Sequence, residues 1–132
     1  MERLLNAAID HVWSHISTLD GLTTPDTSVG RSFQIQDVTP DEIHIATEAG
    51  SPLTLKRAAF LEAIRYLVTN GHDSRHPCEI RSNQLAENSG PLCTTTRRVN
   101  NNTRVINYVV PILAAVGILG ISGSRPNTTW LA

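Results

Sequence analysis

The 132-residue chain is poor in several kinds of residue, and each shortage excludes a class of protein. Only 17% of its residues are charged, against about 25% in an average domain, which excludes a disordered tail or a highly charged coiled coil. Its two cysteines, Cys78 and Cys93, are too few for a disulfide framework, so we expect free thiols. Its single lysine, Lys56, argues against a nuclease site of clustered Asp, Glu and Lys.

Long apolar runs are also missing. The longest, Val109 to Leu119, is interrupted by Pro111 and Gly117 and falls short of the roughly 20 residues that span a bilayer. The first fifteen residues contain acids and histidines, which is unlike a signal peptide. We therefore expect a cytoplasmic protein without membrane contact, whose 40% hydrophobic residues form one compact domain or two small units with a shared core.

Acidic and basic residues divide unevenly along the chain. Residues 1–70 contain nine acidic and five basic side chains, whereas residues 71–132 contain six arginines and three acidic side chains. No acidic residue follows Asn88. A chain polarised in this way can present a basic face to an anion and remain soluble. The alternative is that so small an excess has no functional meaning.

The first part of the chain alternates between helical and strand periods. Apolar residues recur three and four apart from Met1 to Leu19, which predicts an amphipathic helix. Strict alternation between Phe33 and Leu55, broken by two turns, predicts a three-stranded antiparallel meander. A second helical stripe covers Lys56 to Val68. We expect residues 1–71 to form a helix–meander–helix unit, followed by a polar linker from His72 to Pro77.

The second part, residues 78–132, has a different order of elements. We expect a short strand at 79–82, a short helix at 91–98, a turn at 100–102, a longer helix from residue 103, and two extended segments joined by a loop at 122–127. Pro91 suits the first helical position, where its missing N–H costs nothing. Pro111 falls inside the longer helix, which must either begin nearer Val109 or kink.

Helix, turn, helix and hairpin in this order resemble the winged helix-turn-helix superfamily. The match covers roughly Glu79 to Leu131 and is architectural. The complete order, with the helix and small sheet in front, is also similar to small proteins of bacterial restriction-modification or mobile-element loci. The expected fold class is therefore α+β: an N-terminal helix, a three-stranded meander and a helix, followed by a C-terminal winged helix-turn-helix.

The resemblance implies double-stranded DNA as the partner. In this fold the start of the second helix meets base edges, where arginine pairs with guanine and asparagine with adenine. A helix start at Thr103 would also offer backbone amides to a phosphate. The expected contacts are Arg97, Arg98, Asn100, Asn101, Asn102, Thr103, Arg104, Asn107 and, at the tip of the wing, Arg125. We expect a small DNA-binding regulator or accessory module, acting alone, as a homodimer or with another protein.

Other readings of the sequence stay open. A winged helix can instead serve as a protein-interaction or dimerisation module without binding DNA, and scattered or paired arginines would favour that. His72 and His76 have the spacing of a zinc-ligand pair, but Cys78 and Cys93 stand too far apart to complete a typical zinc site. His11 and His15 lie four residues apart and so share a helix face. Such a pair can bind a transition metal, but it more often lies at the solvent edge of an amphipathic helix. No catalytic motif is present, so we expect no enzyme, no cofactor and no bound metal.

Overall fold

The computed structural model describes residues 1–132 and folds them into four α-helices and two antiparallel sheets, which confirms the α+β class. The helices are α1 (Glu2–His15), α2 (Arg57–Thr69), α3 (Pro91–Arg98) and α4 (Ile106–Ala115), with 3-10 turns at η1 (Ile16–Thr18) and η2 (Ala86–Asn88). The strands are β1 (Leu22–Thr23), β2 (Ser32–Val38), β3 (Glu42–Thr47), β4 (Pro52–Lys56), β5 (Cys78–Glu79), β6 (Leu119–Ser122) and β7 (Thr128–Leu131). No helix is both long enough and apolar enough to cross a membrane.

The first sheet has four strands in the order β1-β2-β3-β4, so the three-stranded prediction was one strand short. The missed strand, β1, has only two residues and pairs Leu22 with Phe33 of β2. Two residues are too few to display an alternating pattern, which is why the sequence did not reveal it. In β3 the alternation is clear, because Ile43 and Ile45 are buried while their neighbours are partly exposed. One face of this sheet therefore belongs to the core.

Helices α1 and α2 pack against each other beside this sheet. Leu5, Ile9 and Val12 form the buried stripe of α1. Trp13 lies edge-on to Phe60 of α2 with ring centroids 5.3 Å apart, a geometry that contributes roughly 0.5–1.5 kcal/mol beyond burial. Both N-terminal helices were predicted to within a few residues of their observed ends.

The second sheet has the order β5-β7-β6, in which the first strand pairs with the last. The short strand begins at Cys78 rather than Glu79 and ends at Glu79 rather than Ser82. Helix α3 has the predicted bounds. Helix α4 begins at Ile106, not Thr103. The reason is local: Asn101 and Asn102 both have φ of 54°, in the left-handed region, so the turn is longer than the sequence indicated.

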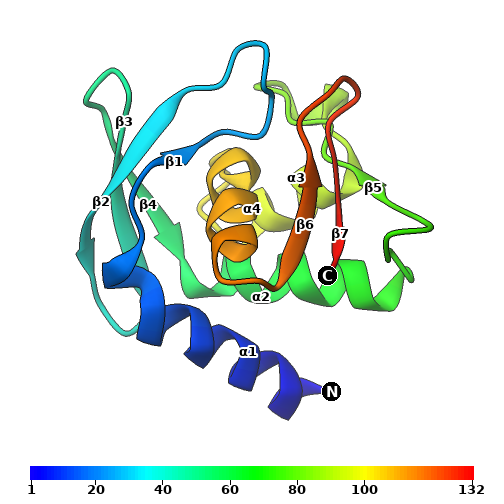
Figure 1. Ribbon diagram of the computed structural model, residues 1–132, viewed down its shortest axis with the longest axis horizontal. Helices are drawn as coiled ribbons and strands as arrows, with labels where there is room; N and C mark the ends of the chain where they lie inside the picture. Colours follow the sequence, from blue (N-terminus) through cyan, green and yellow to red (C-terminus); the bar gives the residue numbers. More distant parts are fainter.

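Helix α4 lies at the centre of the molecule, between the first sheet and the β6–β7 hairpin (Figure 1). Six of its ten residues are buried and only Ala115 is exposed. Tyr108 packs edge-on against Phe33 of β2, with centroids 5.1 Å apart. Pro111 is inside the helix and buried, where its missing N–H leaves the carbonyl of Asn107 without its helical partner. The buried residues of both predicted units form one hydrophobic cluster, from Leu5 to Leu119.

Candidate functional site

Arg97, predicted to contact DNA, is directed into the protein. Its side chain is 7% exposed. Its Nη1 donates to the carbonyl of Asn83 and to Ser89 Oγ, both at 3.1 Å, and its Nη2 donates to the carbonyl of Gln84 at 3.1 Å. These bonds fasten the segment before α3 onto the end of that helix. Arg97 is therefore not available to a ligand, whereas its neighbour Arg98 is exposed.

Asn100 is also committed to the fold. It is 3% exposed, its Oδ1 accepts from the backbone N–H of Lys56 at 2.7 Å, and its Nδ2 donates to the carbonyl of Thr54 at 3.0 Å. A carboxamide carries one acceptor and two donors, so this side chain can continue the backbone pairing of β4. Asn100 thus joins the α3–α4 turn to the first sheet, and its side chain is not available to a ligand.

The remaining residues of the turn, Asn101, Asn102 and Thr103, differ in exposure and in hydrogen bonding. Asn101 and Asn102 are exposed, but their left-handed backbone explains the choice of asparagine without a ligand. The N–H of Thr103 donates to the carbonyl of Asn100 at 3.0 Å. Because α4 starts three residues later, at Ile106, the prediction that Thr103 offers helix-start amides to a phosphate is wrong.

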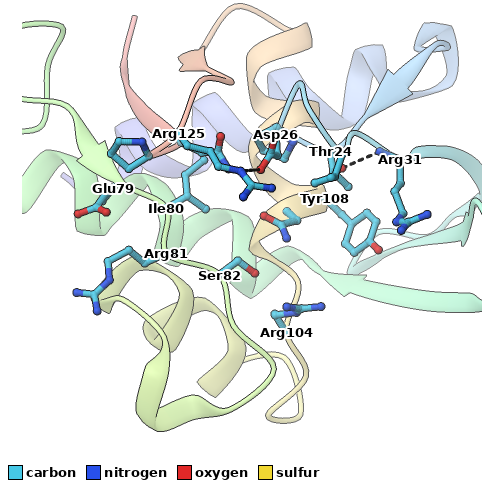
Figure 2. A pocket seen from close by; sticks show the side chains of 15 residues that line it. Thr24, Asp26, Arg31, Glu79, Ile80, Arg81, Ser82, Arg104, Tyr108 and Arg125 are labelled. Carbon is cyan, nitrogen blue, oxygen red and sulfur yellow. Dashed lines mark hydrogen bonds and ion pairs between the residues drawn. The ribbon is translucent and has the colours of Figure 1, made fainter.

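Arg104, Asn107 and Arg125 do come together, in a cleft of about 430 Å³. Its walls come from four separate segments: the β1–β2 loop, residues 79–82, the start of α4, and the tip of the β6–β7 hairpin. Two further arginines, Arg31 and Arg81, line it as well. In the view of Figure 2, Ser82 lies between Arg125 and Arg104, with Tyr108 and Arg31 to one side and Arg81 to the other.

Backbone hydrogen bonds hold the 79–82 wall in place. The N–H of Ile80 donates to the carbonyl of Asn127 at 3.0 Å, and the N–H of Gly90 donates to the carbonyl of Arg81 at 2.9 Å. Arg81 has φ of 43°, a left-handed conformation that costs a residue with a Cβ roughly 1–2 kcal/mol. A Cβ at Gly90 would lie 2.8 Å from that of Arg81, so only glycine permits this approach.

The tip of the β6–β7 hairpin is clasped to the β1–β2 loop, and Figure 1 shows the two side by side. The N–H and Oγ1 of Thr27 both donate to the carbonyl of Gly123, each at 3.1 Å. A Cβ at Gly123 would overlap the Thr27 side chain and the Pro25 carbonyl. Glycine is thus required for the close contact, and the position of Arg125 at the cleft depends on it.

Three of the four arginines of the cleft have no ion-pair partner. Arg125 Nε is 2.9 Å from Asp26 Oδ2, but Arg31, Arg81 and Arg104 take part in no ion pair. Hydrogen bonds from the side chain and backbone of Ser28 lower the pKa of Asp26 well below its usual range, and Arg125 adds to this. Asp26 therefore stays ionised. Four arginines face two carboxylates, Asp26 and Glu79, so the cleft suits an anion.

Sequence reasoning missed Arg31 and Arg81. Arg31 follows a loop of the predicted N-terminal unit, and Arg81 was expected within a strand. Neither belongs to a run or motif, so only the fold brings them to Arg104. The basic excess after residue 70 was the one relevant signal, and it includes Arg81 but not Arg31.

The residues considered for a metal are explained by local contacts. His72 Nδ1 lies 2.9 Å from the carbonyl of His76, and His11 and His15 pack with ring centroids 4.5 Å apart. The structure holds no group of three or more His, Cys, Asp or Glu side chains that could bind a metal ion. Cys78 and Cys93 are free and buried, and burial raises the pKa of the Cys78 thiol to about 11. Buried thiols of this kind are unreactive.

No protein-family model, no curated protein and no solved structure matches this chain.

Proposed function

We propose that the protein binds double-stranded DNA through the arginine-lined side of a winged-helix unit. The observation that carries the proposal is the meeting of Arg104 and Arg125 with Arg31 and Arg81 around one cleft beside the hairpin tip. Three of these arginines have no carboxylate partner, and phosphate contacts by arginine supply most of the affinity of DNA-binding proteins.

The order of elements supports the winged-helix assignment. Helix α2, strand β5, helices α3 and α4, and strands β6 and β7 follow one another, and the sheet order is β5-β7-β6. A helix-turn-helix with a following hairpin has this arrangement. The hairpin tip, which carries Arg125, then corresponds to the wing.

We expect the arginines to contact the phosphates of the DNA backbone and not the bases. A recognition helix needs exposed side chains toward the major groove, yet Ala115 is the only exposed residue of α4, and β2 covers Tyr108. Phosphates fix position without reading sequence. We therefore expect affinity to depend on salt and to vary little with base sequence. Such binding fits an accessory module of a restriction-modification or mobile-element system better than a sequence-specific regulator.

The test is duplex binding measured by fluorescence anisotropy at several salt concentrations. The logarithm of affinity should fall with the logarithm of salt by about 0.9 for each phosphate contact. Arg104→Ala and Arg125→Ala should each reduce that slope by about 1. Arg75→Ala, an exposed arginine of the 72–77 linker outside the cleft, is the matched control. Absence of binding to random duplex at low salt would refute the proposal.

A second candidate function is that of a protein-interaction module. The burial of α4 favours it, because the helix that should read DNA is covered by the first sheet. The inward orientation of Arg97 favours it as well. On this reading the arginines serve solubility, and the partner is a second copy or another protein. Failure of duplex binding together with self-association in solution would support it.

A further inference from the structure

We propose that the arginine cleft binds a small organic phosphate monoester of nucleotide size. The proposal goes beyond DNA binding, although the two share Arg104 and Arg125. It starts from the shape of the site. A volume of about 430 Å³ lies within the roughly 300–1,000 Å³ range of small-molecule pockets. The phosphate backbone of a duplex would meet only the rim of such a hollow, whereas a small ligand enters it.

The charge of the cleft selects a dianion. Four arginines and two carboxylates line it, which leaves two positive charges in excess. A phosphate monoester carries about −1.5 to −2 charges at pH 7, whereas a carboxylate or a backbone phosphodiester carries one. The planar guanidinium forms paired hydrogen bonds with phosphate oxygens. Arg31, Arg81 and Arg104 are free to do so, because none is held by a carboxylate.

An unsatisfied hydroxyl lies at the same place. Ser82 Oγ is buried and has no hydrogen-bond partner, which is rare for a buried polar atom. Figure 2 shows this residue between Arg125 and Arg104. The hydroxyl is closed to solvent as placed, and rotation about the Cα–Cβ bond of Ser82 would turn it toward the cleft, where a ligand oxygen would satisfy it. The preceding residue, Arg81, holds a left-handed backbone with φ of 43°, and strain of this kind concentrates at binding sites.

The rest of the lining suits the organic part of the ligand. Only three of the fifteen lining residues are hydrophobic, so a purely apolar ligand is excluded. These three include Tyr108 and Val29, which offer an apolar wall for a sugar or a ring. Asn107 lies in the first turn of α4, where its backbone N–H has no partner inside the helix. A nucleoside monophosphate combines the required charge, polarity and size.

The test is calorimetric titration of the complete protein with AMP, inorganic phosphate and adenosine, in the absence of DNA. AMP should bind, inorganic phosphate more weakly, and adenosine at least about tenfold more weakly than AMP, because the arginines recognise the phosphate. Arg31→Ala should weaken AMP binding by about tenfold and Ser82→Ala by a few-fold. Arg75→Ala should leave it unchanged. Thermal unfolding of each variant checks that the fold is intact.

Three results would overturn the proposal: no AMP binding at millimolar concentration, equal binding of AMP and adenosine, or equal AMP affinity in wild type and in Arg31→Ala. The source of the monoester is settled by comparing hairpin duplexes with a 5′-phosphate and a 5′-hydroxyl end. If the phosphorylated end binds more tightly and Arg31→Ala abolishes the difference, the monoester is a strand end; without a difference, it is a free nucleotide. Duplexes with hydroxyl ends report on the proposed DNA binding alone, so either proposal can fail by itself.

Discussion

Two arginine-bearing regions of this protein differ in what their side chains do. The run from Arg97 to Asn102 is continuous in sequence, yet two of its polar members, Arg97 and Asn100, are buried and bonded to the protein's own backbone. The cleft is assembled from four separate segments, and three of its arginines are unpaired. The polar residues that are adjacent in sequence hold neighbouring segments of the protein together. The arginines that can contact a ligand come from segments that only the fold brings close.

The largest effect is expected from Arg97→Ala. The change removes three hydrogen bonds, to the carbonyls of Asn83 and Gln84 and to Ser89 Oγ, and hydrogen bonds to a charged group contribute about 1.5–3 kcal/mol. The Asn83 carbonyl keeps the Ser89 hydroxyl as a donor, whereas the Gln84 carbonyl loses its side-chain donor. The free energy of unfolding, measured in urea, should fall by at least about 2 kcal/mol. Arg98→Ala, one residue along α3 and exposed, should change it by less than about 0.5 kcal/mol. Equal effects at the two positions would contradict the conclusion that Arg97 has a structural role that Arg98 lacks.

Asn100→Ala should be the next most damaging. It leaves the N–H of Lys56 and the carbonyl of Thr54 unpaired beside the turn, which costs about 1–3 kcal/mol. Asn102→Gly is the matched control, because glycine adopts the left-handed φ of 54° without strain. The free energy of unfolding, measured by chemical denaturation, should be lower for Asn100→Ala than for Asn102→Gly. If Asn102→Gly is as destabilising as Asn100→Ala, the contribution of Asn100 lies in the turn itself and not in its bonds to β4.

A change in the cleft should act in the opposite direction on stability. At φ of 43°, Arg81→Gly removes backbone strain, whereas Arg81→Ala retains it. The glycine variant should therefore be more stable than the alanine variant by about 1 kcal/mol, although both lose the same guanidinium. Thermal unfolding measures this difference, and AMP titration should find both variants equally weakened. A glycine variant no more stable than the alanine variant would show that Arg81 is not strained in solution.

The smallest effect concerns the pH dependence of the clasp at Asp26. A carboxyl whose pKa is lowered by folding contributes stability above its unfolded pKa of about 3.8 and loses it as the pH falls toward the folded pKa. Wild type and Asp26→Asn should differ by a constant amount in melting temperature from about pH 7 to pH 5. The difference should shrink below about pH 4. Asp73, whose pKa is also lowered by hydrogen bonds from Arg75 and His76, is common to both proteins and cancels.

Periodicity predicted most elements of this fold because it reports one buried face at a time. The stripes of α1 and α2 and the alternation of β2 to β4 were accessible in this way, whereas the bounds of α3 followed from Pro91 at its start and the turn after it. Strand β1 was not, since two residues carry no period. The start of α4 was misplaced because the left-handed backbone of Asn101 and Asn102 extends the turn.

The candidate site was less predictable than the fold. Composition indicated a basic second half, and three of the expected DNA contacts, Arg104, Asn107 and Arg125, line one cleft. The contributions of Arg31 and Arg81 depend on contacts between distant segments, for which a single sequence has no local pattern. The burial of Arg97 is of the same kind, because its acceptors lie in a loop without regular structure.

The clasp between Thr27 and Gly123 has a consequence for how the protein folds. These residues stand 96 positions apart in the chain, and closing so long a loop is entropically costly until other contacts have brought its ends together. Closing the loop costs least once both sheets hold its ends near each other, so we expect the clasp to form late in folding. The cleft lies between the joined segments. Partly folded chains therefore lack it, and ligand binding there becomes a direct measure of how many molecules have completed the fold.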